Sequence, residues 1–137
     1  AKVKIGQTAL FLVGSDDKLS GQPDLTGLAS QVRVADFVIF LGNHPDLLTE
    51  ALKATSADGD NHWFDLALFG HTLGGQFTFI GLPLKASLVP AAGTRYLSGW
   101  RTESRASILI SNGVGTRDFP ARILAPAKIH LITLKAQ

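Results

Sequence analysis

The chain alternates between short apolar runs and polar or glycine-containing segments, and this pattern predicts strands and helices. Apolar runs that are too short for helices predict strands at 3–5, 8–13, 36–41, 64–69, 76–80, 95–100, 106–111 and 127–134. One helix is expected over 23–32, where Pro23 suits the first turn, and another over 45–52, where four apolar residues have helical spacing. This order of elements predicts an α/β fold with mixed β-sheet layers and flanking helices.

The polar segments between these runs predict how the elements are connected. Gly6-Gln7 is expected to join the first two strands as a hairpin. The segment 82–93 contains Pro83, Pro90 and Gly93 and has little periodicity, which predicts an ordered loop or a lid. The chain shows no internal repeat or linker, and 137 residues suit one core, so we expect a single domain over residues 1–137.

Composition narrows the class of protein. Apolar residues make up 45% of the chain and charged residues 18%, which indicates a globular domain. The net charge of +2 comes without a Lys/Arg cluster, so nucleic-acid binding is not favoured. No apolar run approaches a membrane span, and no signal peptide precedes the strand at 3–5, so we expect a cytoplasmic protein without a membrane partner. The absence of cysteine leaves His, Asp, Glu and Asn as the possible metal ligands.

The most informative motif is Gly70-His71-Thr72-Leu73-Gly74-Gly75-Gln76, which follows the apolar run 64–69. A histidine at the end of a buried strand, flanked by glycines that let other groups approach the backbone, is well placed to bind a metal or a phosphate. The motif resembles the GHTHGGQ signature of calcineurin-like metallophosphoesterases. Leu73 stands where that signature has its second histidine.

Further motifs extend the resemblance over nearly the whole chain. Leu41-Gly42-Asn43-His44-Pro45-Asp46 resembles a metal-binding loop of the family, roughly SHNPD, with the histidine and the asparagine exchanged relative to Pro45. Gly14-Ser15-Asp16-Asp17 resembles the family's turn after a strand. Matches to the family's closing region occur at Tyr96, Gly99, Ser111 to Thr116, Pro120, Arg122, Pro126 and Ile129 to Leu134. The family's opening motifs do not occur before Gly14, so the resemblance is to the C-terminal half of the family fold.

This resemblance implies a metal-dependent phosphoesterase that hydrolyses a small phosphodiester or phosphotriester with a metal-activated water. Divalent metal ions (Mn, Zn or Fe) are the implied cofactors. His71, Asn43 and His44 are the implied metal ligands, and His44 is also a candidate catalytic acid or base. Which of Asn43 and His44 faces a metal stays open. Leu73 cannot bind a metal, so one of the family's two metals loses a ligand.

The missing half of the family fold predicts a homodimer, because each subunit would cover the face that the other leaves bare. An alternative is a catalytically silent remnant that serves as a structural or interaction module, and another is a fragment of a longer enzyme. Several other polar residues are more simply explained by turns, surface or structure, although each could take part in a site. They are Asp16, Asp17, His62, His130, Arg95, Arg101, Arg117 and Arg122.

Overall fold

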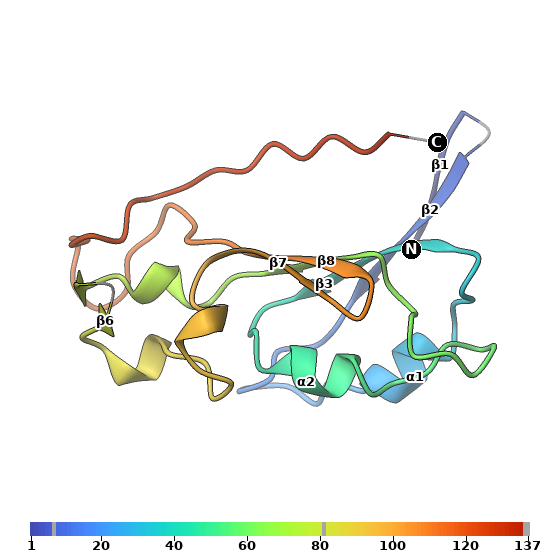
Figure 1. Cartoon of the computed structure of the whole chain (residues 1–137), viewed down its shortest axis with the longest axis horizontal. Helices are drawn as coiled ribbons and strands as arrows, with labels where there is room; N and C mark the ends of the chain where they lie inside the picture. The colour runs from blue at the N-terminus through green and yellow to red at the C-terminus, as the bar shows by residue number, and fades with distance from the viewer. Residues whose placement is uncertain (7, 81, 136–137) are drawn as a thin grey trace.

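The computed structural model describes residues 1–6, 8–80 and 82–135, and its centre is a six-stranded sheet in the order β1-β2-β3-β4-β8-β7 (Figure 1). These strands are β1 Lys2–Ile5, β2 Thr8–Gly14, β3 Phe37–Gly42, β4 Leu66–Phe69, β7 Gly99–Glu103 and β8 Ala106–Ile110. The central strands β2, β3, β4 and β8 are parallel, and β1 and β7 pair antiparallel at the two edges. The expected mixed α/β architecture is therefore confirmed.

One face of the sheet carries the main core. The helices α1, Leu25–Ala29, and α2, Leu47–Ala51, cover this face, below the sheet in Figure 1. Val38 and Phe40 of β3 are fully buried there, and Phe40 packs at 5.1 Å between ring centroids against Trp63. Alternation along β3 thus directs every second side chain to this core. Within the described ranges, no helix is long and apolar enough to cross a membrane.

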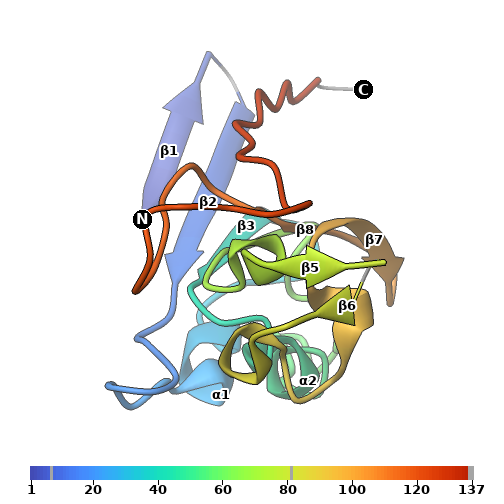
Figure 2. The ribbon, with the colours of Figure 1, turned by 90° about the vertical axis from the view of Figure 1, so that its left-hand side faces the viewer.

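The second face of the sheet has a thinner cover. Its buried residues Leu10, Ile39 and Leu66 form a smaller cluster, against which Ile132 of the C-terminal segment packs. Figures 1 and 2 show this segment passing the sheet on the side away from the helices. Parallel strands are usually covered on both faces, so this side of the sheet is the less complete layer.

One predicted strand and one predicted loop differ from the structure. The run 76–80 forms only β5, Thr78–Phe79, which pairs with β6, Leu82–Pro83. Gln76 and Ile80 have φ values of 50° and 49°, and such left-handed residues interrupt an extended ladder. The predicted loop 82–93 therefore contains β6 and a short 3-10 turn, Ala86–Leu88.

Two other strand predictions were wrong. In place of 95–100, the chain forms a 3-10 turn, Thr94–Tyr96, and then β7 from Gly99, whose φ of 91° breaks the run. The segment 127–134 makes no described strand pairing. Its apolar residues alternate, with Ile129 and Leu131 almost fully exposed and Ile132 packed on the second face. The segment lies across a face, where it has no strand edge to pair with.

Both helices were predicted, although α1 covers only Leu25–Ala29 of the expected range 23–32. Helix α1 begins after Asp24, whose carboxylate accepts the Gly27 backbone N–H at 2.8 Å, so Asp24 caps the helix that Pro23 was expected to open. Helix α2 lies inside the predicted range 45–52. The hairpin of β1 and β2 is present, but Gln7 of its predicted turn lies outside the described residues.

Candidate functional site

Polar residues from several loops gather at the end of the sheet where its parallel strands finish. Because β2, β3, β4 and β8 are parallel, their carboxyl ends lie side by side, and the segments that follow them all begin there. We call this the carboxyl edge of the sheet. Asp17 follows β2, Asn43 and His44 follow β3, His71 follows β4 and Asn112 follows β8. Open α/β sheets place their ligands at this carboxyl edge, so the fold brings the candidate residues to a suitable place.

The two histidines of these loops lie against each other. The rings of His44 and His71 are 4.3 Å apart between centroids and tilted by 42°. His44 is only 6% exposed, whereas His71 is half-buried and has a φ of 65°. A positive φ is uncommon for a histidine, and it turns the chain sharply after β4. The local backbone therefore positions His71 beside His44.

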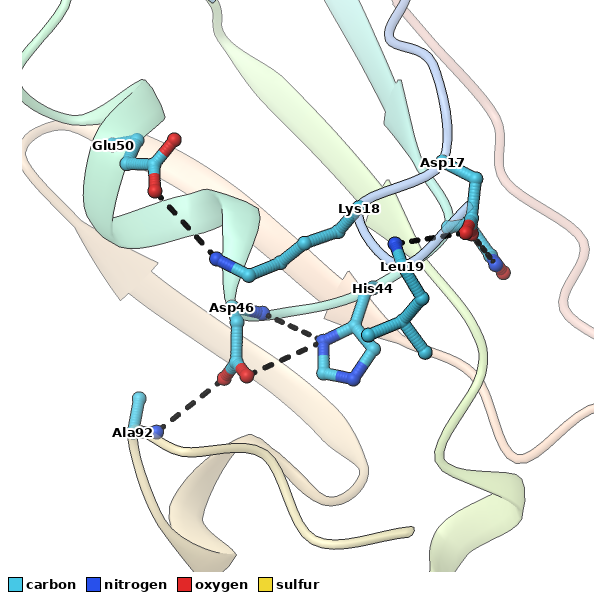
Figure 3. A network of polar contacts seen from close by, with 8 residues as sticks. Asp17, Lys18, Leu19, His44, Asp46, Glu50 and Ala92 are labelled. Carbon is cyan, nitrogen blue, oxygen red and sulfur yellow. Dashed lines mark hydrogen bonds and ion pairs between the residues drawn. The ribbon is translucent and has the colours of Figure 1, made fainter. Parts of the chain in front are cut away.

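His44 is oriented by the start of α2. Its Nδ1 accepts the Asp46 backbone N–H at 3.2 Å and lies 3.5 Å from Asp46 Oδ2, as Figure 3 shows. When the His44 imidazole is neutral, an Nδ1 that accepts this hydrogen bond carries no proton, and the proton then lies on Nε2. Asp46 in turn accepts the Ala92 backbone N–H at 3.4 Å, which links the segment 82–93 to the site. His44 is thus held in place through its own loop.

Asn43 and Asp17 form a second pair at the same edge. Asn43 Nδ2 donates to Asp17 Oδ2 at 2.5 Å, and Asp17 Oδ1 accepts from the backbone N–H groups of Leu19 and Ser20 and from the Ser20 hydroxyl, each at 2.9 Å. The Asn43 bond, followed by the bonds from Ser20 and Leu19, holds the pKa of Asp17 well below its ordinary value. The pair therefore presents an ionised carboxylate and the Asn43 side-chain oxygen.

The pKa of His71 is lowered from its ordinary value of 6.5. Burial is the largest cause, and the charges of His44 and Arg117 add to it, while Asp17 and Asp46 act in the opposite direction. The neutral imidazole is the form that binds a metal. The site therefore favours the ligand form of His71 near neutral pH.

The glycine-rich turn after His71 is fixed by close packing. Thr72 is fully buried, and its hydroxyl donates to the Leu97 carbonyl at 2.7 Å. Gly74 has a φ of 62°, and a Cβ at this position would lie 2.6 Å from Cγ of Asn112. Only glycine satisfies both conditions, so the sequence at this position is explained by the approach of Asn112.

The donors at this edge fit part of a metal site. Imidazole nitrogens and amide or carboxylate oxygens suit Mn, Zn or Fe, and His44, His71 and Asn43 supply these types. Over 1–6, 8–80 and 82–135, however, no three His, Cys, Asp or Glu side chains converge as a set that could hold a metal ion. A catalytic zinc usually takes three protein ligands, so the two histidines would need Asn43 as the third ligand among the described residues.

Three other candidate residues, His62, Asp16 and His130, have other partners or positions. His62 precedes β4, hence lies toward the opposite edge, and its Nε2 is 3.4 Å from Asp65 Oδ1. Asp16 accepts the Gln22 and Asp17 backbone N–H groups at 3.0 and 2.8 Å, so it serves its own turn. His130 belongs to the C-terminal segment.

Three residues hold the site loops together, in roles that the sequence did not reveal. Gln76 is fully buried and binds the segment 117–121, Asn112 packs on Gly74, and Arg122 donates to the Leu73 carbonyl at 2.8 Å. Gln76 ends the glycine-rich motif, and that position was its only signal. The partners of Arg122 are backbone carbonyls, which no side-chain pattern could reveal.

Comparison with known proteins places this geometry in context. The chain is 34% identical over 122 residues, 88% of its length, to the uncharacterized metallophosphoesterase YkuE of Bacillus subtilis. It is 31% identical over 102 residues, 74% of its length, to an uncharacterized metallophosphoesterase of Aquifex aeolicus. These matches support a relation to the metallophosphoesterases over most of the chain.

The relation covers only part of each relative. The chain spans 39% of the Bacillus protein and 34% of the Aquifex protein. No protein-family model matches the chain, and no solved structure matches it.

Proposed function

We propose that the chain carries part of a metal-dependent phosphoesterase site, which hydrolyses a small phosphodiester or phosphotriester. The observation that carries this proposal is the contact between the rings of His44 and His71 at the carboxyl ends of parallel strands, next to Asn43 in the loop after β3. The named relatives support the same chemistry, because both are metallophosphoesterases by name.

Each residue has a distinct role in this proposal. His71 binds a divalent metal through its imidazole, and Asn43 adds its side-chain oxygen, which stays available while Nδ2 donates to Asp17. His44 is a further ligand or a proton donor through Nε2, since Nδ1 is occupied by the Asp46 backbone. A bound divalent metal would lower the pKa of a water and offset the charge of the phosphoryl group.

The incomplete ligand set motivates the second part of the proposal, a homodimer. With Leu73 in the position of a family ligand and no three converging His, Cys, Asp or Glu side chains among the described residues, we expect further ligands to come from a second copy. A second copy packed on the thinly covered sheet face would bury that face and could bring further ligands toward the edge.

A catalytically silent module is the competing function. Leu73 favours it, because an apolar side chain occupies the position of a family ligand. In that case the glycine-rich turn and its buried partners Thr72, Gln76 and Asn112 would be kept for their packing alone.

Metal content separates the two functions. The purified chain, its His71→Ala variant and a His62→Ala control would be loaded with Mn, Zn or Fe and analysed for bound metal and for hydrolysis of a chromogenic phosphodiester. We expect His71→Ala to lose both metal and turnover, while His62→Ala keeps both because His62 lies away from the stacked pair. Thermal unfolding would verify that both variants are folded. A His71→Ala protein with unchanged metal content would overturn the proposal in favour of the silent module.

A further inference from the structure

Arg117 lies on a segment that is clamped directly to the glycine-rich turn of the site. Its backbone N–H donates to Gln76 Oε1 at 2.9 Å. The other end of the same amide, Gln76 Nε2, donates to the Phe119 and Ala121 carbonyls at 2.9 and 3.0 Å. Because Gln76 is fully buried and lies five residues after His71, it fixes the start of this segment relative to the histidine.

The guanidinium of Arg117 remains available at this position. Its side chain is 53% exposed and donates no hydrogen bond to the described part of the chain. The nearest carboxylate is Asp118, 4.0 Å from Nε, and that carboxylate is already paired with Lys85. Arg117 therefore holds a planar set of donors that the fold itself does not use.

Other cationic residues around the site are engaged. Lys18 pairs with Glu50 at 3.6 Å, and Lys85 pairs with Asp118. Arg122 directs its guanidinium to backbone carbonyls. Among these neighbours, Arg117 is the one that combines a fixed backbone with an uncommitted head group. Its charge also reaches His71, where it contributes to the lowered pKa of the imidazole.

We propose that Arg117 binds the non-bridging oxygens of a phosphoryl group held beside His71, and that it selects anionic phosphoesters over neutral phosphotriesters. A guanidinium donates two parallel hydrogen bonds to an anionic phosphoryl group, and a triester offers no negative oxygen for that pairing. The inference rests on the proposed phosphoesterase function for the nature of the substrate, and it decides between the two ester classes that the function leaves open.

Inorganic phosphate is a probe for this site that requires no turnover. The metal-free chain, Arg117→Ala, Arg117→Lys and an Arg33→Ala control would be titrated with phosphate by calorimetry at low ionic strength. The His71 imidazole resonance would be followed in parallel. Arg33 precedes β3, so it lies at the amino ends of the parallel strands, away from His71. We expect Arg117→Ala to weaken phosphate binding about tenfold or more, because it removes charged hydrogen bonds. Arg117→Lys should retain part of the affinity, and Arg33→Ala all of it.

The fold and the ester preference provide independent readouts. Arg117→Ala should leave the unfolding temperature unchanged, since the guanidinium donates to no described residue. In the metal-loaded protein it should raise KM for a phosphodiester and leave that for a neutral triester unaltered.

The outcomes separate the two proposals. Unchanged phosphate affinity in Arg117→Ala, an equal loss in Arg33→Ala, or no phosphate binding by the unaltered chain would each overturn the role of Arg117. Phosphate binding that depends on Arg117 in a chain that never hydrolyses esters would support that role and overturn the phosphoesterase function.

Discussion

At the scale of single residues, the site is defined by two histidines whose surroundings differ. His44 is buried and bound through Nδ1, whereas His71 is half-buried and adopts a strained φ of 65°. Local strain of this kind concentrates at functional sites, because the surrounding structure must hold it in place. The motif and its spacing predicted that both residues follow strands. The contact between their rings could not be predicted, since it depends on the register of β3 and β4.

The stacked pair predicts an unusual titration of His71. Its pKa is lowered in the folded chain, so the folded state binds this proton less readily than the unfolded state. The stability that neutral His71 contributes is fully present above its ordinary value of 6.5 and is lost as pH falls through the lowered value. As pH falls from 6.5 to the lowered value, the unaltered chain should therefore lose more stability than His71→Asn does.

Nuclear magnetic resonance measures this directly. The His71 Hε1 resonance of the metal-free protein should titrate below pH 6.5 and return to its ordinary midpoint in denaturant. His44→Asn should move the midpoint part of the way back, because it removes the second-largest cause of the shift. A midpoint at or above the ordinary value would show that the pair is absent in solution.

At the scale of elements, the parallel strands were predictable and the closing segments were not. Apolar runs identified β2, β3, β4 and β8 because both faces of these strands contact other residues. The segments 95–100 and 127–134 also contain apolar residues, but Gly99 interrupts the first and no strand edge is available to the second. The pattern of apolar and polar residues indicates which side chains are buried. Strand pairing, in contrast, depends on partners far away in the sequence.

Arg122 holds the loops after β4 and β8 together through its guanidinium group. Its guanidinium donates to the Leu73 and Asn112 carbonyls at 2.8 Å each, to Ala125 at 3.1 Å and to Gly115 at 3.0 Å. Lysine keeps the charge but lacks the planar set of donors, so Arg122→Lys should leave several part-buried carbonyls unpaired and cost about 2–4 kcal/mol in the free energy of unfolding.

Urea denaturation measures this cost against a matched control. Arg105 forms one exposed ion pair with Asp60 at 3.1 Å, so Arg105→Lys should change the free energy of unfolding by less than about 1 kcal/mol. Equal effects of the two substitutions would show that Arg122 does not organise the loops around Leu73.

At the scale of the whole molecule, the two faces of the sheet are unequally covered. Strand register places Leu41, Leu68, Leu109 and Trp100 in one row across the second face. Leu41 and Trp100 are 39% and 49% exposed, while Phe40, on the helix-covered face, is fully buried. Apolar rows of this kind mark interaction surfaces, and a central parallel sheet favours cover on both sides. This asymmetry is the structural reason to expect a second copy of the chain here.

The homodimer proposal can therefore be tested on this row. Sedimentation of the unaltered chain at micromolar concentration should give a dimer, whose interface should exceed about 1,000 Å². Leu41→Glu and Trp100→Glu each place a charge on the second face, so both should shift the chain to monomer, because an unpaired charge is costly to bury. Leu84→Glu is the matched control, since Leu84 is 69% exposed but belongs to the β5–β6 region. It should leave the dimer intact.

If the unaltered chain is monomeric and metal binding still depends on His71, the site does not need a second copy. The exposed row would then require a different cover.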